Sequence, residues 1–143
     1  MRIGKMEKKE VKKIWEFDPV VYPFRLWVGK NVPHKSVEET FWALTDNMDK
    51  TPFDEKYYIR DRFVCATCYP VCDKESGWIG IFCNIQDTKL LTAGRMAHEA
   101  THIVDFLCEK FGIECYTFAQ GEPRAYLVEW ATNCIDKVKR GAV

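Results

Sequence analysis

Residues 92–112 constrain the fold more than any other segment, because their pattern fits an α-helix and no other regular element. Apolar residues recur there at helical spacing: Met96, Ala100, Ile103, Val104, Leu107 and Phe111. At 100° per residue they form one stripe along a helix of about five turns. Thr92 is a suitable N-cap and Gly112 a suitable C-terminal stop. The sequence therefore predicts a helix that packs its stripe against a core.

The opposite side of this helix carries His98, His102 and Asp105, where a solvent-facing helix would carry Lys and Glu. Two imidazoles at i and i+4 can bind one Zn²⁺, and Glu99 beside them can act as general base toward a zinc-activated water. The motif predicts hydrolysis with one Zn²⁺ per chain, His98 and His102 as metal ligands and Glu99 as catalytic residue. The alternative is a pair of histidines that only pack or face solvent.

A catalytic zinc needs a third protein ligand, and the only other histidine is His34, so a carboxylate is the expected donor. Residues 121–139 predict a last helix, with a core stripe made of Leu127, Val128, Ala131, Cys134, Ile135 and Val138. Its other face carries Glu122, Tyr126 and Glu129. Because seven residues of helix span roughly 10 Å, the two glutamates cannot bind the same ion. Glu122 is the predicted ligand and Glu129 the alternative.

The motif His98-Glu99-Ala-Thr-His102, followed by Glu122-Pro-Arg-Ala-Tyr126, resembles the gluzincins. These are zincin metallopeptidases with glutamate as third ligand, and the chain resembles in particular the small uncharacterised peptidases of bacterial and phage genomes. The resemblance covers about residues 20–140. It implies an α+β, zincin-like fold: a small mixed or antiparallel sheet on an active-site helix, with Glu122 on a C-terminal helix. It also implies a peptide or protein substrate. The runner-up is a zinc-binding regulatory or interaction protein on the same scaffold.

Two supporting roles stay open at this point. Larger gluzincins often carry an aspartate four residues after the third ligand, where this chain has Tyr126. Asp105 is the candidate to orient a histidine instead, against an ordinary ion-pair role. For stabilising the transition state, the available donors are Tyr126, Arg124 and His34.

The remaining elements are expected from composition. Residues 20–29 read as a strand, and Ser36 with Glu39 reads as a capping box at the start of a helix whose buried side carries Val37, Phe41 and Leu44. Residues 57–71 and 78–85, separated by turn-forming residues, predict an antiparallel pair. Residues 78–85 are either an edge strand that binds an extended peptide or a fully paired core strand.

Seven cysteines cannot all pair within one chain, and we expect free thiols. Cys65, Cys68, Cys72 and Cys83 contain one C-x₂-C pair, which raises the alternative of a second, structural zinc site. The C-x₂-C lies in a run that reads as strand, so packing as small hydrophobic side chains is favoured.

Length and composition limit the number of domains, the kinds of partner and the location that we expect. The chain of 143 residues has the size of one domain, and its 21 basic and 21 acidic residues give no net charge to attract nucleic acid. We expect residues 1–19 to be a charged, frayed extension and residues 20–143 to be a single domain. No apolar run is long enough to span a bilayer, so the expected location is cytoplasmic without membrane contact. The oligomeric state is left undetermined.

Overall fold

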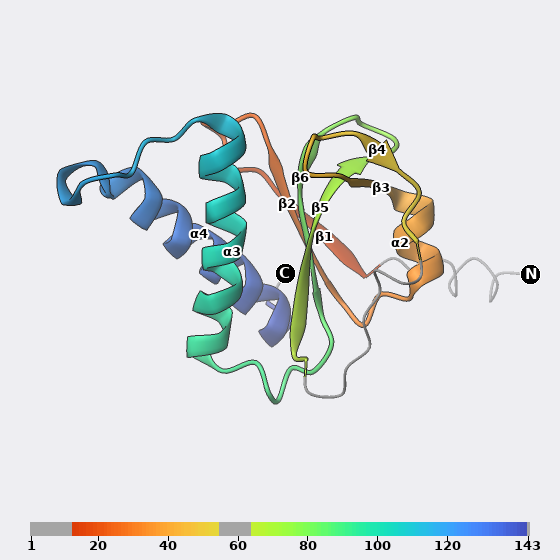
Figure 1. Cartoon of the computed structure of the whole chain (residues 1–143). Helices are drawn as coiled ribbons and strands as arrows, with labels where there is room; N and C mark the ends of the chain where they lie inside the picture. Colours follow the sequence, from red (N-terminus) through yellow and green to blue (C-terminus); the bar gives the residue numbers. More distant parts are fainter. Residues whose placement is uncertain (1–12, 55–63, 143) are drawn as a thin grey trace, which may run out of the picture.

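The computed structural model describes residues 13–54 and 64–142, which form a six-stranded sheet with helices on both faces (Figure 1). The strands are β1 (Ile14–Phe17), β2 (Arg25–Lys30), β3 (Phe41–Leu44), β4 (Lys50–Thr51), β5 (Ala66–Asp73) and β6 (Ile79–Ile85). The helices are α2 (His34–Thr40), α3 (Ala93–Phe111) and α4 (Glu122–Arg140), with a 3₁₀ turn, η2 (Phe118–Gln120), before α4.

The sheet is mixed, with strand order β1-β2-β6-β5-β3-β4. Among the described strands, only β2 and β6 pair in parallel, and the other four pairings are antiparallel. The expected α+β class with a small mixed sheet is confirmed. The expected antiparallel pair is also confirmed for β5 and β6, whereas residues 57–63 of that prediction lie outside the described residues.

Strand β1 corrects the predicted boundary at residues 19 and 20. Ile14–Phe17 pairs antiparallel with β2, from Ile14 opposite Gly29 to Phe17 opposite Leu26. These alternating side chains therefore belong to the sheet rather than to a frayed extension. Residues 1–12 of the predicted extension lie outside the described part of the chain.

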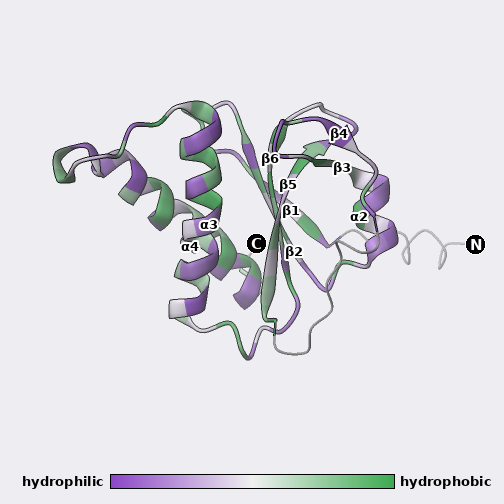
Figure 2. Ribbon diagram, in the orientation of Figure 1, coloured by the Kyte–Doolittle hydropathy of each residue, from purple (hydrophilic) through white to green (hydrophobic). Residues whose placement is uncertain are grey.

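Two hydrophobic cores lie on the two faces of the sheet (Figures 1 and 2). Helices α3 and α4 cover one face, where Leu26, Val28 and Ile81 of the sheet meet Ile103 and Ile135 of the helices. The other face carries α2 and an aromatic cluster made of Trp27, Phe41, Phe53, Tyr69 and Phe82. Period-two alternation along the strands separates the cores: Leu26 faces the long helices, and Trp27 faces α2.

The long helices agree with the sequence predictions at both ends and on both faces. Thr92 caps α3 by accepting a hydrogen bond from the backbone N–H of Arg95, and Gly112 ends the helix in the left-handed conformation at φ 67°. The stripe residues Met96, Ala100, Ile103, Val104 and Leu107 are buried. Helix α4 likewise buries Leu127, Ala131, Cys134, Ile135 and Val138.

Two local predictions were wrong. Helix α2 starts at His34 after Pro33, so Ser36 is a buried residue inside the helix instead of its cap, and Phe41 and Leu44 belong to strand β3. Strand β2 starts at Arg25, because residues 20–22 form a bend in which Val20 has φ 70°. Within residues 13–54 and 64–142, no helix has the length and apolar character needed to cross a membrane.

Candidate metal centre and active site

Helix α3 presents the histidine motif on its side away from the core. Ala100 and Ile103 are fully buried between the helix and the sheet, which fixes the rotation of α3. His98 and His102, four residues apart, consequently lie on the exposed side, and Glu99 is half-buried between the two sides. The position predicted for the motif, opposite the apolar stripe, follows from this packing.

The two imidazoles converge. Nε2 of His102 lies 3.1 Å from Nε2 of His98, with the rings nearly perpendicular at 82° and their centroids 4.7 Å apart. Two imidazole nitrogens bound to one tetrahedral zinc at about 2.0–2.1 Å would stand roughly 3.3 Å apart. The separation of the two nitrogens is therefore close to that of two ligands on one zinc ion. It also fits a simple hydrogen bond in which one ring donates and the other accepts.

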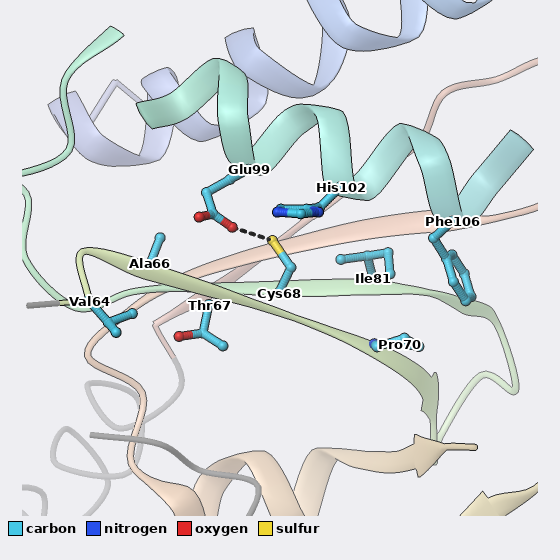
Figure 3. A pocket seen from close by; sticks show the side chains of 9 residues that line it. All are labelled: Val64, Ala66, Thr67, Cys68, Pro70, Ile81, Glu99, His102 and Phe106. Carbon is cyan, nitrogen blue, oxygen red and sulfur yellow. Dashed lines mark hydrogen bonds between the residues drawn. The ribbon is translucent and has the colours of Figure 1, made fainter. Parts of the chain in front are cut away.

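Glu99 points from α3 toward strand β5, where it meets a cysteine. The thiol of Cys68 donates a hydrogen bond to Oε2 of Glu99 at 3.3 Å (Figure 3). Cys68 also stands directly opposite Cys83 on β6. Hydrogen bonding to Cys83, reinforced by burial and by the nearby Glu99 carboxylate, raises the pKa of the Cys68 thiol well above its ordinary value. Cys68 is therefore a neutral donor to Glu99 at physiological pH.

A cavity of about 460 Å³ opens between α3 and β5 (Figure 3). Three of the side chains that line it can bind a metal: Cys68, Glu99 and His102. The other lining residues are mostly apolar: Val64, Ala66, Thr67, Pro70, Ile81 and Phe106. An open cavity with a few converging polar groups in an apolar wall has the make-up of a small-molecule or peptide site.

The strand beside the cavity has one side without a described partner. Strand β3 pairs with the C-terminal end of β5, from Val71 to Asp73. Strand β6, on the other side, pairs with β5 along Ala66–Cys72. Across residues 13–54 and 64–142, no strand is paired with Ala66–Pro70 on the β3 side. Of the two alternatives for residues 78–85, the structure shows the paired core strand, because β6 lies between β2 and β5. Among the described strands, β5 is the one that borders the motif with part of one side left without a partner.

The predicted carboxylate ligands lie elsewhere on α4. Glu122 and Tyr126 line a second cavity of about 410 Å³ with Pro19, Val21, Tyr22, Pro123, Leu127 and Trp130. This cavity shares no lining residue with the one beside Glu99 and His102. Glu129 is exposed one helical turn after Tyr126. The described side chains include no group of three or more His, Cys, Asp or Glu arranged to hold a metal ion.

The other named polar residues have partners away from the two histidines. Oδ1 of Asp105 lies 2.7 Å from the guanidinium of Arg124, which joins α3 to α4. His34, on α2 at the opposite face of the sheet, contacts the carbonyl of Phe53 at 2.6 Å and lies 3.8 Å from the Glu38 carboxylate. The structure thus gives Asp105 the ion-pair role that was its alternative.

All seven cysteines are free, as expected. Cys65, Cys72 and Cys83 are buried, consistent with packing as small hydrophobic side chains, and Cys68 is half-buried at the cavity. Sequence reasoning missed the contact of Cys68 with the motif. Strand alternation places Cys68 on the same face as buried Ala66, but nothing in the sequence specifies which helix covers that face.

Comparison with known proteins identifies no relative. No protein-family model matches the sequence, and no curated protein or solved structure shows significant similarity to it. The resemblance to gluzincins therefore rests on the spacing of His98, Glu99, His102 and Glu122 alone.

Proposed function

We propose that the protein is a zinc-dependent metallopeptidase of the zincin kind, with His98 and His102 as metal ligands and Glu99 as general base. The observation that carries the proposal is the 3.1 Å separation of the two Nε2 atoms on the exposed side of α3, next to the Glu99 carboxylate, which lines a cavity together with His102. This separation is close to the distance between two imidazole nitrogens bound to one tetrahedral zinc ion.

Zinc, when bound, lowers the pKa of a coordinated water and polarises a carbonyl group. The protein groups then divide the work. His98 and His102 would hold the ion beside the cavity, and the Glu99 carboxylate would take a proton from the attacking water and return it to the leaving amine. The half-buried position of Glu99 keeps it in place between the helix and β5.

The side of β5 that has no partner among the described strands supports an extended peptide as the substrate class. A peptide that adds as a strand along Ala66–Pro70 forms main-chain hydrogen bonds, and its alternate side chains enter the cavity. Pro70 has no N–H to donate, so the pairing ends there. Such a substrate crosses the site beside Glu99, which comes from the helix facing this part of the strand.

Glu99→Gln tests the proposal on the purified full-length chain. Glutamine keeps the size of the side chain but cannot accept the proton, so we expect hydrolysis of a quenched peptide library to fall by a factor of about 10²–10⁴ while zinc stays bound. Zinc is measured by elemental mass spectrometry. His98→Ala and His102→Ala should each lose the metal, and His34→Ala is the matched histidine control.

Three outcomes separate the candidates. Zinc near one per chain, with activity lost in Glu99→Gln, supports the peptidase. Zinc bound through His98 and His102 without peptide hydrolysis by the wild type supports the regulatory zinc protein. A folded wild-type chain that binds no zinc when it is added would falsify both and leave the histidines as a surface pair.

A further inference from the structure

We infer that Cys68 becomes the third protein ligand when the metal binds, so that the centre is a His₂Cys site in place of His₂Glu, although the described side chains do not already stand as a three-ligand group. This inference rests on the proposed function, since it concerns the same ion. It differs from the assignment of Glu122 that the gluzincin resemblance implies.

The position of Cys68 is the first argument. Of the side chains that line the cavity next to the motif, the ones able to bind zinc are Cys68, Glu99 and His102. Glu99 is required as base, which leaves Cys68 as the additional ligand. Figure 3 shows its side chain pointing from β5 toward α3, with the sulfur in contact with Glu99.

The position of Glu122 is the second argument. It is exposed at the first residue of α4, where it lines the separate cavity with Tyr22 and Trp130. Arg124, which points from α4 to α3, meets Asp105, one turn beyond His102. The side of α4 that approaches α3 is thus the Arg124 side, and Glu122 is two residues, or about 200°, away from it.

The chemistry of the donors is the third argument. Zinc accepts sulfur and nitrogen ligands together, and catalytic zinc with cysteine and histidine ligands is well established. A strand inside a sheet holds a ligand firmly, and Cys68 is held by its pairing opposite Cys83. Binding exchanges the hydrogen bond between Cys68 and Glu99 for a bond from sulfur to metal. The thiol proton leaves to solvent, and both oxygens of Glu99 become available for a proton from water.

Metal binding by Cys68→Ser tests the inference, with Cys115→Ser as matched control and Glu122→Ala as the competing variant. Cys115 is half-buried between α3 and α4 and lines neither of the two cavities. Loss of an outer-shell partner costs about 10–100-fold in metal affinity, so loss of a ligand should cost more. We expect zinc affinity to fall by at least about 100-fold in Cys68→Ser and to stay unchanged in the other two variants.

Cobalt substitution gives a second readout that does not depend on activity. Co²⁺ bound to thiolate shows a strong near-ultraviolet charge-transfer band, which we expect in the wild type and in Cys115→Ser but not in Cys68→Ser. Cys68→His supplies a different ligand at the same point and should bind Co²⁺ without the band. Circular dichroism of each variant confirms that it is folded.

The inference and the proposed function fail in different ways. Wild-type zinc binding that is lost in His98→Ala and Glu122→Ala but kept in Cys68→Ser overturns the inference alone. The inference alone is also overturned if the wild type binds two zinc ions and Cys68→Ser loses one that His98→Ala and His102→Ala keep. That result would reveal a separate cysteine site. Absence of zinc in the folded wild type overturns both.

Discussion

Asp105 and Arg124 form the ion pair that joins the motif helix to the last helix, with 2.7 Å between Oδ1 and a guanidinium nitrogen. Asp105 lies three residues after His102 on the same side of α3, so the pair ties the histidine face of α3 to α4. It also accounts for a charged residue, Arg124, near the apolar stripe of α4. The distance between the two helices at this level depends on both side chains.

Asp105→Asn should lower the free energy of unfolding by less than about 1 kcal/mol, because Asp105 is 58% exposed and solvent screens the pair. Chemical denaturation at low and high salt measures the effect, and the difference from the wild type should shrink as salt rises. Arg140→Met is a control within α4, since Arg140 pairs with Asp136 four residues before it. Should Asp105→Asn instead abolish zinc binding at unchanged stability, Asp105 orients a histidine after all.

Phe106→Ala should change which peptides are cleaved. Phe106 is half-buried and forms the apolar wall of the cavity with Val64 and Ile81. Its removal widens the cavity, so kcat/KM should fall by about 10-fold or more for peptides with an apolar residue next to the scissile bond. Peptides with alanine there should change little. Equal loss for both sets would mean that Phe106 supports the fold and does not contact substrate. Phe111→Ala, on the same helix but outside this cavity, is the control.

Gly80→Ala should destabilise the sheet strongly. A Cβ at Gly80 would lie 1.8 Å from the carbonyl oxygen of Arg25, its partner in the parallel pairing of β2 with β6. The backbone must move to remove this overlap, and we expect a loss of at least about 2 kcal/mol in denaturant unfolding. Gly94→Ala is the matched control, because its Cβ would meet no atom within 4 Å at the start of α3. There the change should be neutral or stabilise by up to about 1 kcal/mol. A Gly80→Ala protein as stable as the wild type would contradict the close approach of the two strands.

Stability should decline at alkaline pH because of Cys134. Burial in the core between α4 and the sheet raises the pKa of this thiol to about 12. The thiol in the unfolded chain has a pKa of about 8.5. Above that pH the folded state therefore holds a proton that the unfolded state has lost. The protonated Cys134 thiol therefore contributes fully to the free energy of unfolding below pH about 8.5, and this contribution is lost as pH rises toward about 12. Cys134→Ala removes this contribution, so its stability should fall less steeply than that of the wild type between pH 9 and 11, where both are compared by chemical denaturation. Parallel curves would contradict the buried protonated thiol.

The sequence by itself determined the two long helices of the site and which side of each helix is buried. Helix α3 was predictable from its caps and stripe, since Thr92, Gly112 and the spacing of Met96, Ala100 and Ile103 are local signals. The convergence of His98 with His102 follows directly, because residues four apart share one face of any helix. The same logic held for the buried stripe of α4.

Only the tertiary structure decided what stands opposite the motif. Whether β5 or β6 borders the site depends on strand order, and period-two patterns are nearly the same for a central strand and for one paired only in part. Likewise, the helical pattern shows that Glu122 and Tyr126 share a face but not whether that face meets α3 or the loop of Val21 and Tyr22. The contact of Cys68 with Glu99 joins residues 31 positions apart, and such a pairing arises from packing the helix on the sheet rather than from any local signal.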